Sequence, residues 1–160
     1  MDKKVLIIGE VFVDTHLDII DINGPLIRLG GIFHSARAFS AIGVEYVLAY
    51  YAPDYLDDDI NYYSCVLRSQ GCYRIGEVKN APNVMLVNES KEVGEQGYYN
   101  ILKDQAVYTE LEKLINIVNI TKPTDILIYP GRYNTKKILG DLGNYKGRIH
   151  IDFHYDSDDI

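Results

Sequence analysis

The chain has 160 residues and a formal net charge of −7, from 16 basic and 23 acidic residues. This length predicts one domain with a sizeable core, and an acidic chain without a basic cluster is not expected to bind nucleic acid. The two cysteines, Cys65 and Cys72, do not suggest a disulfide framework or a metal knuckle. The first apolar run, residues 5–8, is too short for a signal sequence or a membrane span, so we expect a cytoplasmic protein.

The first element predicted is a strand that starts at residues 5–8, Val-Leu-Ile-Ile. Continuous apolar runs of this kind are typical of the buried strands of a parallel sheet. After Gly9 polar and apolar residues alternate, so Glu10, Asp14 and His16 share one face. A strand that turns a polar face outward leaves the core at its C-terminal end, where open α/β sheets bind ligands. Asp14 is therefore expected either to meet a polar ligand or to lie on a solvated strand face.

Gly30 and Gly31 come directly before a predicted helix over residues 32–42, which is rich in small side chains and is closed by Gly43. Glycine lets the backbone approach a ligand closely, and the unpaired N–H groups of the following helix point at the same place. The pair alone is equally typical of an ordinary tight turn.

The remaining elements alternate between strands and helices. Strands are predicted over residues 45–51, 125–129 and 148–155, and helices over residues 57–70, 109–119 and 135–142. Thr109 and Glu112 have the spacing of a capping box. Residues 73–79, 84–88 and 98–102 are predicted to form a meander, a flap over one edge or face. Helices between strands imply parallel pairing and an α/β sheet.

Two of these segments are distinctive in combination. Residues 9–14, Gly-Glu-Val-Phe-Val-Asp, end the first strand, and Gly30-Gly31 open a helix that ends in Ile42-Gly43. Together they resemble the ribokinase (PfkB-type) carbohydrate kinase family, with a spacing most similar to its heptose-kinase-like members. Residues 81–84, 124–128 and 149–152 resemble later strands of the family. The resemblance implies the N-terminal half of a ribokinase-like α/β fold, one domain over residues 1–160, with β lid segments at about 15–29 and 73–102.

The resemblance also implies a sugar or nucleoside site between the first strand and the helix after the glycines. By position, Asp14 would accept hydrogen bonds from sugar hydroxyls, and Gly30 and Gly31 would let the backbone approach the ring. A buried carboxylate needs hydroxyl partners, which would select against apolar ligands. His34 stands where the family has asparagine, and histidine is bulkier and titrates near neutrality.

The family's phosphoryl-transfer motif, Gly-x-Gly-Asp, does not occur in these 160 residues. Because this transfer needs positioned donors and a base, we expect the chain alone to be inactive, with no catalytic residue of its own. ATP and Mg²⁺ are implied by the resemblance only, with their sites outside this chain. The chain is interpreted as the sugar- or nucleoside-binding half of an ATP-dependent carbohydrate kinase. The alternative is a degenerate, non-catalytic subunit that binds a ligand or another protein.

Polar residues also alternate along the last predicted strand: His150, Asp152, His154 and Asp156. A polar strand end is favoured there over a metal site, because neighbours on one strand face are about 7 Å apart. Asp152, like Glu10, is expected in a supporting role. His16 is expected at the surface, and Arg132 as a solvated loop residue rather than an anion ligand.

The sheet predicted here would end after an inner strand, with one edge unpaired. An open edge and its apolar surface favour association. We therefore expect a homo-oligomer, or a complex with a complementary C-terminal half.

Overall fold

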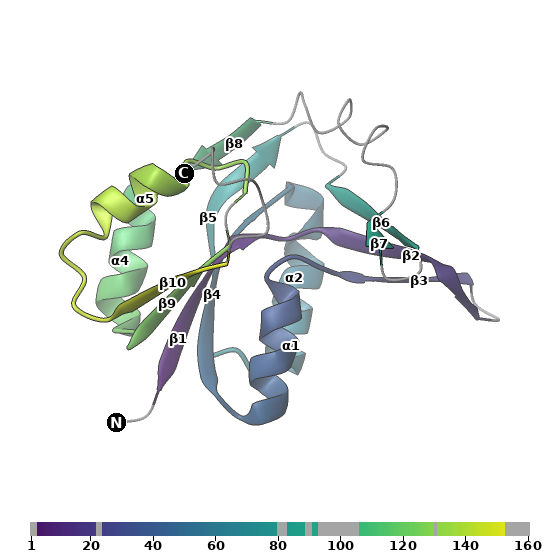
Figure 1. Ribbon diagram of the computed structural model, residues 1–160, viewed down its shortest axis with the longest axis horizontal. Coiled ribbons are helices and arrows are strands. Elements are labelled where there is room, and N and C mark those ends of the chain that lie inside the picture. Colours follow the sequence, from purple (N-terminus) through teal and green to yellow (C-terminus); the bar gives the residue numbers. More distant parts are fainter. Residues whose placement is uncertain are drawn as a thin grey trace.

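The computed structural model describes residues 3–21, 24–79, 83–88, 91–92, 106–129 and 131–152. Their strands form a six-stranded main sheet and a four-stranded second sheet (Figure 1). In the main sheet the strand order is β10-β9-β1-β4-β5-β8. The first five of these run parallel, and β8 pairs antiparallel with β5. Their bounds are β1 Lys4–Glu10, β4 Glu45–Ala52, β5 Cys72–Lys79, β8 Ala106–Thr109, β9 Asp125–Ile128 and β10 Arg148–Ile151.

Helices cover both faces of the main sheet. They are α1 Phe33–Ile42, α2 Asp57–Val66, α4 Leu111–Thr121 and α5 Thr135–Asp141. Successive residues of β1 point to opposite faces, so Leu6 packs in a core with α4 and α5, and Ile7 packs in a second core with α1 and α2. Both side chains are fully buried. This confirms the predicted α/β sheet, mainly parallel and covered by helices on both faces.

The second sheet has the strand order β3-β2-β6-β7. It consists of β2 Val13–Asp21, β3 Gly24–Leu29, β6 Val84–Asn88 and β7 Lys91–Glu92. Only Val11 and Phe12 separate β1 from β2, so the chain passes directly from one sheet into the other. In Figure 1 the second sheet projects to one side, beyond the C-terminal end of β1.

The structure confirms the first helix and the start of the first strand. α1 starts one residue after the expected position and ends at the expected Ile42, and Gly43 closes it with φ 71°. The first strand was expected to end at Asp14, but β1 ends at Glu10, and Asp14 lies on β2 of the second sheet. The next helix, predicted to reach residue 70, ends earlier, because α2 stops at Val66 and Arg68 adopts a left-handed φ of 59°.

The predicted meander is wrong in its first strand. Residues 72–79 form β5, which pairs parallel with β4 inside the main sheet. The reason is that α2 crosses back over the sheet before β5, and such a crossover returns the chain parallel to the previous strand. Ile75 and Val78 are then buried in the same core as Leu114 of α4. Residues 84–88 do lie in the second sheet, whereas the predicted strand at 98–102 lies outside the described residues.

The predicted capping box of the third helix is also wrong. The N-cap of α4 is Glu110, without a side-chain capping bond, and Thr109 is the last residue of β8. The Thr109 hydroxyl instead donates to the Tyr51 hydroxyl, 3.3 Å away. Pairing of β8 with β5 extends through Thr109, so α4 begins one residue later than predicted and Glu110 takes the N-cap position.

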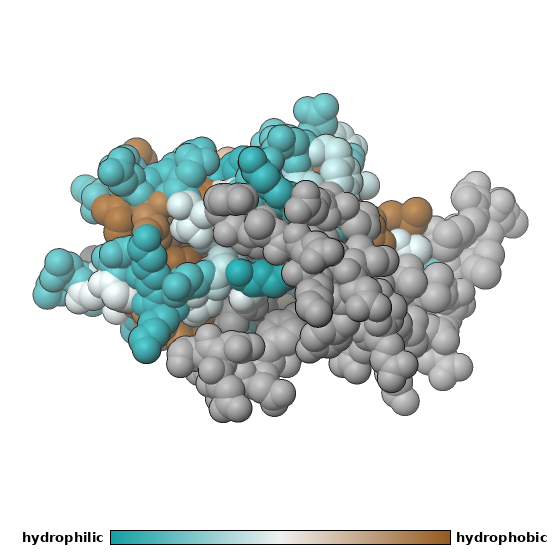
Figure 2. All heavy atoms as spheres, turned by 90° about the horizontal axis from the view of Figure 1, so that it is seen from above, coloured by the Kyte–Doolittle hydropathy of each residue, from teal (hydrophilic) through white to brown (hydrophobic). Residues whose placement is uncertain are grey.

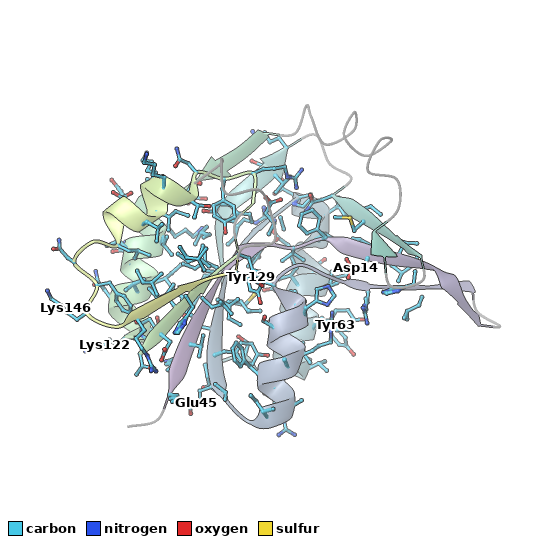
Figure 3. The ribbon with its side chains drawn as sticks, in the orientation of Figure 1. Asp14, Glu45, Tyr63, Lys122, Tyr129 and Lys146 are labelled. Carbon is cyan, nitrogen blue, oxygen red and sulfur yellow. The ribbon has the colours of Figure 1, made fainter. Side chains whose placement is uncertain are left out.

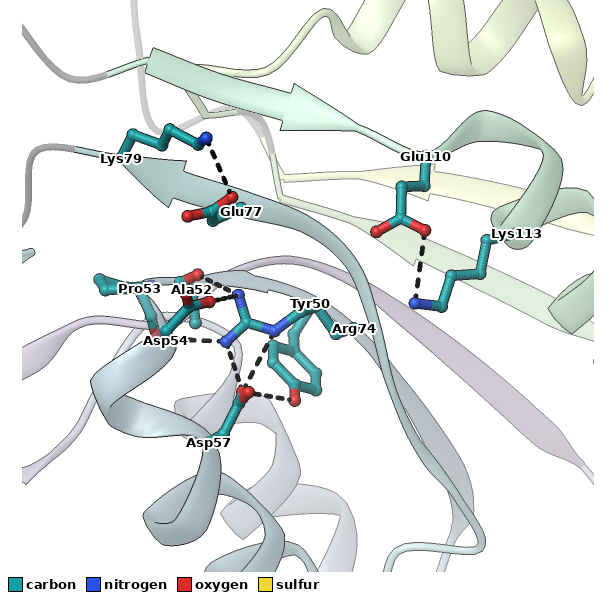
Figure 4. A network of polar contacts seen from close by, with 10 residues as sticks. All are labelled: Tyr50, Ala52, Pro53, Asp54, Asp57, Arg74, Glu77, Lys79, Glu110 and Lys113. Atoms are coloured by element: carbon teal, nitrogen blue, oxygen red, sulfur yellow. Dashed lines mark hydrogen bonds and ion pairs between the residues drawn. The ribbon is translucent and has the colours of Figure 1, made fainter.

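Arg74 ties the end of β4 to the start of α2 (Figure 4). Its guanidinium donates to the carbonyl oxygens of Ala52, 2.6 Å, and Pro53, 3.2 Å, and to the Asp57 carboxylate. The Tyr50 hydroxyl also donates to Asp57, at 3.0 Å. Asp57 therefore has a structural partner in the main sheet besides its place in the first turn of α2.

Among the described residues seen from above in Figure 2, hydrophilic atoms predominate, and apolar atoms show over the side of α4 and α5 and again toward the second sheet. None of the helices in the described part of the chain is long and apolar enough to cross a membrane. Cys65 and Cys72 are both free.

Candidate functional site

The two glycines form the turn that leads from the second sheet into α1. Gly31 has φ 59°, a backbone conformation that side chains disfavour, and a Cβ atom on it would collide with the Glu10 carbonyl oxygen. The turn is held against the end of β1, because the Gly30 N–H donates to the Phe12 carbonyl at 2.7 Å and the Ile32 N–H donates to that of Glu10 at 3.1 Å.

Asp14, on β2, lies directly over this turn (Figure 3). A Cβ atom on Gly30 would overlap the Asp14 carboxyl group. Only 4% of Asp14 is exposed. The glycines were expected to admit a ligand, but the space that their missing side chains leave is taken by atoms of the protein itself. At Gly30 the close approach is that of the Asp14 carboxylate to the backbone.

His34 and Arg28 contact the Asp14 carboxylate from two other elements. His34, in the first turn of α1, places Nε2 2.9 Å from Asp14 Oδ2. Arg28 is the residue of β3 that pairs with Asp14 in the strand register, and its Nε lies 3.9 Å from the same oxygen. The side chains of His34 and Arg28 are 52% and 41% exposed, against 6% for Asp14. The carboxylate thus forms the floor of the site, and the two nitrogen-bearing side chains form its rim.

Arg37, one turn further along α1, supports His34 from behind. Its Nη2 lies 3.0 Å from His34 Nδ1, and its Nη1 donates to the Leu29 carbonyl at 2.9 Å. Sequence reasoning did not single out this residue. The signal for it is the three-residue spacing from His34, which places both side chains on one side of the helix.

Glu10 is buried at the C-terminal end of β1 and is held by Arg132, from the segment between β9 and α5. The Arg132 backbone N–H donates to Glu10 Oε1 at 2.7 Å, and its guanidinium forms an ion pair with Oε2. The same guanidinium donates to Asn83 Oδ1 and stacks over the Phe12 ring, 5.5 Å from its centroid. The expectation of a solvated arginine is wrong, because a buried carboxylate at the strand end demands a charged partner.

His16 is also placed differently from the prediction. It was expected at the surface, yet it is only 8% exposed, and its Nε2 is buried without a hydrogen-bond partner in the described part of the chain. Its position two residues from Asp14 puts the two side chains on one face of β2. The histidine that contacts Asp14 is His34, which is distant in sequence.

The polar end of β10 is separate from this site. Asp152 follows β10 on the same edge of the sheet, two strands away from β1, and its N–H donates to the Ile128 carbonyl at 3.0 Å. His150 contacts Asp125 at 3.0 Å, whereas His154 and Asp156 lie outside the described residues. Among the residues described, no three His, Cys, Asp or Glu side chains are grouped so that they could hold a metal ion.

An open groove lies at the opposite end of the molecule, between α4 and the segment that follows α5. Lys122 and Lys146 line it, and Figure 3 shows both far from Asp14. The groove contains none of the buried charged groups that distinguish the Asp14 site, so we take the Asp14 site as the candidate functional site.

No protein-family model matches the sequence, and no curated protein sequence matches it either. Solved structures do match. Phosphofructokinase-2 from Escherichia coli, in its tetrameric inhibited form, superimposes with a TM-score of 0.59 at 13% identity, over 95% of this chain and 55% of its own. The 2-dehydro-3-deoxygluconokinase from Thermotoga maritima gives 0.54 at 14% identity, over 96% and 51%.

A microbiome-derived acarbose kinase gives a TM-score of 0.57 at 11% identity, over 96% of this chain and 54% of that one. The chain thus spans about half the length of the solved structures that it matches. These neighbours are PfkB-type, or ribokinase-type, carbohydrate kinases. At such low identity the likeness concerns the fold: the chain has a ribokinase-like α/β fold, over about half the length of the kinases that share it.

Proposed function

We propose that this chain is the sugar- or nucleoside-binding half of an ATP-dependent carbohydrate kinase. The observation that carries the proposal is the buried Asp14 carboxylate at the C-terminal edge of the main sheet, where the second sheet begins. Among the described side chains, His34 and Arg28 both contact Oδ2. A ligand hydroxyl would be a further hydrogen-bond donor to this carboxylate, because a buried carboxylate requires such partners.

The second sheet would act as the lid over the bound sugar. Its strands β2 and β3 supply Asp14 and Arg28, so closure of this sheet would bring both side chains onto the ligand. We further propose a cytoplasmic location, because Cys65 and Cys72 are free thiols.

Phosphoryl transfer would need residues from outside this sequence. The sequence has no Gly-x-Gly-Asp. The part of this chain in the reaction would therefore be to bind and orient the sugar. A complementary C-terminal half, or a second copy of the chain, would pair with β10, an edge strand of the main sheet.

The test is a thermal-shift and calorimetric screen of hexoses, pentoses, polyols and nucleosides. We expect at least one of them to raise the melting temperature of the wild type, and Asp14→Asn to abolish that shift. Asp125→Asn is the matched control, because Asp125 is an equally buried aspartate that also contacts one arginine and one histidine, at the other end of β9 and β10. A panel without any binder, or a shift that survives Asp14→Asn, would overturn the proposal.

A second function is favoured by one observation. The Asp14 carboxylate already has two protein partners, and one of them, His34, stands where the family has asparagine. This favours a kinase-like subunit that binds a ligand or a partner protein without catalysis. The two functions differ in one measurement on the protein isolated from its natural source with its partners. Mass spectrometry would detect a phosphorylated sugar after addition of ATP and the bound sugar only if the first function is right.

A further inference from the structure

Positive charge gathers around Asp14 although the chain as a whole carries a net charge of −7. Arg28 contacts the carboxylate at 3.9 Å, and Arg37 lies behind His34. Among the described side chains, Asp14 is the only carboxylate within 4.0 Å of the Arg28 guanidinium, and none lies that close to Arg37. Of the two arginines, only Arg28 is therefore in contact with a described carboxylate.

The hydrogen bonds of His34 determine whether its side chain carries a third positive charge. A guanidinium only donates hydrogen bonds, so His34 Nδ1 must accept the bond from Arg37 Nη2. The ring proton then sits on Nε2 and is donated to Asp14 Oδ2. In this arrangement His34 is neutral, and the site holds two positive charges against one negative charge.

The two arginines are close enough to repel each other. Burial lowers the pKa of Arg37, the charge of Arg28 lowers it further, and the charge of Asp14 partly raises it again. Among the described side chains, the single negative charge of Asp14 thus balances only one of the two positive charges of the arginines. An anion bound at the rim of the site would supply the missing negative charge, and charge-assisted hydrogen bonds to a guanidinium are among the strongest that a site can make.

The exposure of the side chains indicates where such an anion would bind. The Asp14 side chain is 6% exposed, whereas the Arg28 side chain is 41% exposed. A ligand hydroxyl would reach the carboxylate on the floor, and a negatively charged group on the same molecule would reach Arg28 on the rim.

We propose that the ligand of this site is an anionic sugar, a sugar acid or a sugar phosphate, whose carboxylate or phosphate is bound by Arg28, with the nearby positive charge of Arg37 adding to the attraction. This inference rests on the proposed sugar-binding function and names the substrate class.

The experiment compares ligands of one carbon skeleton by isothermal titration calorimetry at low salt. D-Gluconate and D-glucose 6-phosphate are the anionic probes, and D-glucitol and D-glucose are the neutral ones. We expect an anionic probe to bind about tenfold or more tightly than its neutral counterpart, the effect of one charge-assisted hydrogen bond. The difference should shrink as salt is added. The two anionic probes tell a sugar acid from a sugar phosphate.

Arg28→Gln should remove this preference, so that the variant binds an anionic probe no more tightly than its neutral counterpart. Arg148→Gln is the matched control, since Arg148 forms the corresponding ion pair with Asp125 outside the site. Equal affinities for anionic and neutral probes, or a preference that survives Arg28→Gln, would overturn the inference and leave the proposed function standing. Failure of every probe and of the wider sugar panel would overturn both.

Discussion

The carboxyl group of Asp14 occupies the space in which a side chain on Gly30 would lie. Gly30→Ala therefore forces Asp14 to rotate away from the turn and from His34. Because a short side chain can move at modest cost, we expect a small loss of stability but loss of ligand binding. Chemical denaturation and calorimetry with the sugar found in the screen measure the two effects separately.

The control for this substitution is Gly140→Ala in α5. A Cβ atom on Gly140 meets nothing within 4 Å. Alanine in a helix is favoured over glycine by about 1 kcal/mol, so this variant should be slightly more stable and bind normally. A Gly30→Ala protein that binds as tightly as the wild type would contradict the role given to the Asp14 position.

Arg132 and Glu10 join the segment after β9 to the point where the two sheets meet. Only 3% of the Glu10 side chain is exposed, so Arg132→Met leaves a buried carboxylate without its charged partner. Breaking such a pair costs about 3–5 kcal/mol, and we expect a loss of that order in urea denaturation. The double variant Glu10→Gln with Arg132→Met should recover part of the loss, since it removes both charges. Additive losses would show that the two residues act independently.

Arg74 makes several directed hydrogen bonds that a lysine cannot reproduce. Its guanidinium spans the carbonyls of Ala52 and Pro53 and the Asp57 carboxylate. We expect Arg74→Lys to destabilise the protein by about 1–3 kcal/mol, because the ammonium group is a point donor without the planar fork. Arg68→Lys, at an exposed position, is the control. Equal melting temperatures of the two variants would contradict this account.

Asp125 should make the stability depend on acid pH. Hydrogen bonds from Arg148, and next from His150, hold the pKa of Asp125 well below its usual range. A carboxyl group with a lowered pKa in the folded state contributes stability above the pKa of the unfolded state, about 3.9. That contribution is lost as the pH falls through the lower folded-state value.

Urea denaturation from pH 7 down to about pH 2 measures this dependence. Asp125→Asn should be less stable than the wild type at pH 7, and the gap should stay constant down to the unfolded-state pKa of about 3.9 and narrow below it. If the free energies of unfolding of the wild type and of Asp125→Asn differ by a constant amount over this whole range, the lowered pKa is not the source of the stabilisation.

The sequence pattern was sufficient to predict the layers of the main sheet. The apolar runs of β1, β4 and β9 are typical of buried strands, and the helices between them imply parallel pairing. The pairing of β5 was not predicted, since a single alternating strand fits either sheet, and its burial against α4 depends on residues far along the chain.

The site was predictable only in part, for a similar reason. Asp14 and the glycines stand in a short segment with a recognisable spacing. Arg132, in contrast, contacts Glu10 although the two residues are 122 positions apart in the sequence, and no local sequence pattern predicts such a contact. His16 and Asp14 share a strand face, but the histidine on the neighbouring helix is the one that reaches the carboxylate.

This separation in sequence has a consequence for folding. Asp14, Arg28, His34 and Arg37 all lie within 24 residues, so their mutual contacts close a short loop and cost little chain entropy. The contact between Arg132 and Glu10 closes a very long loop and requires β9 to be docked beside β1. We therefore expect the contacts among Asp14, Arg28, His34 and Arg37 to form early during refolding. The ion pair between Arg132 and Glu10 should form in a late step, after the main sheet has assembled.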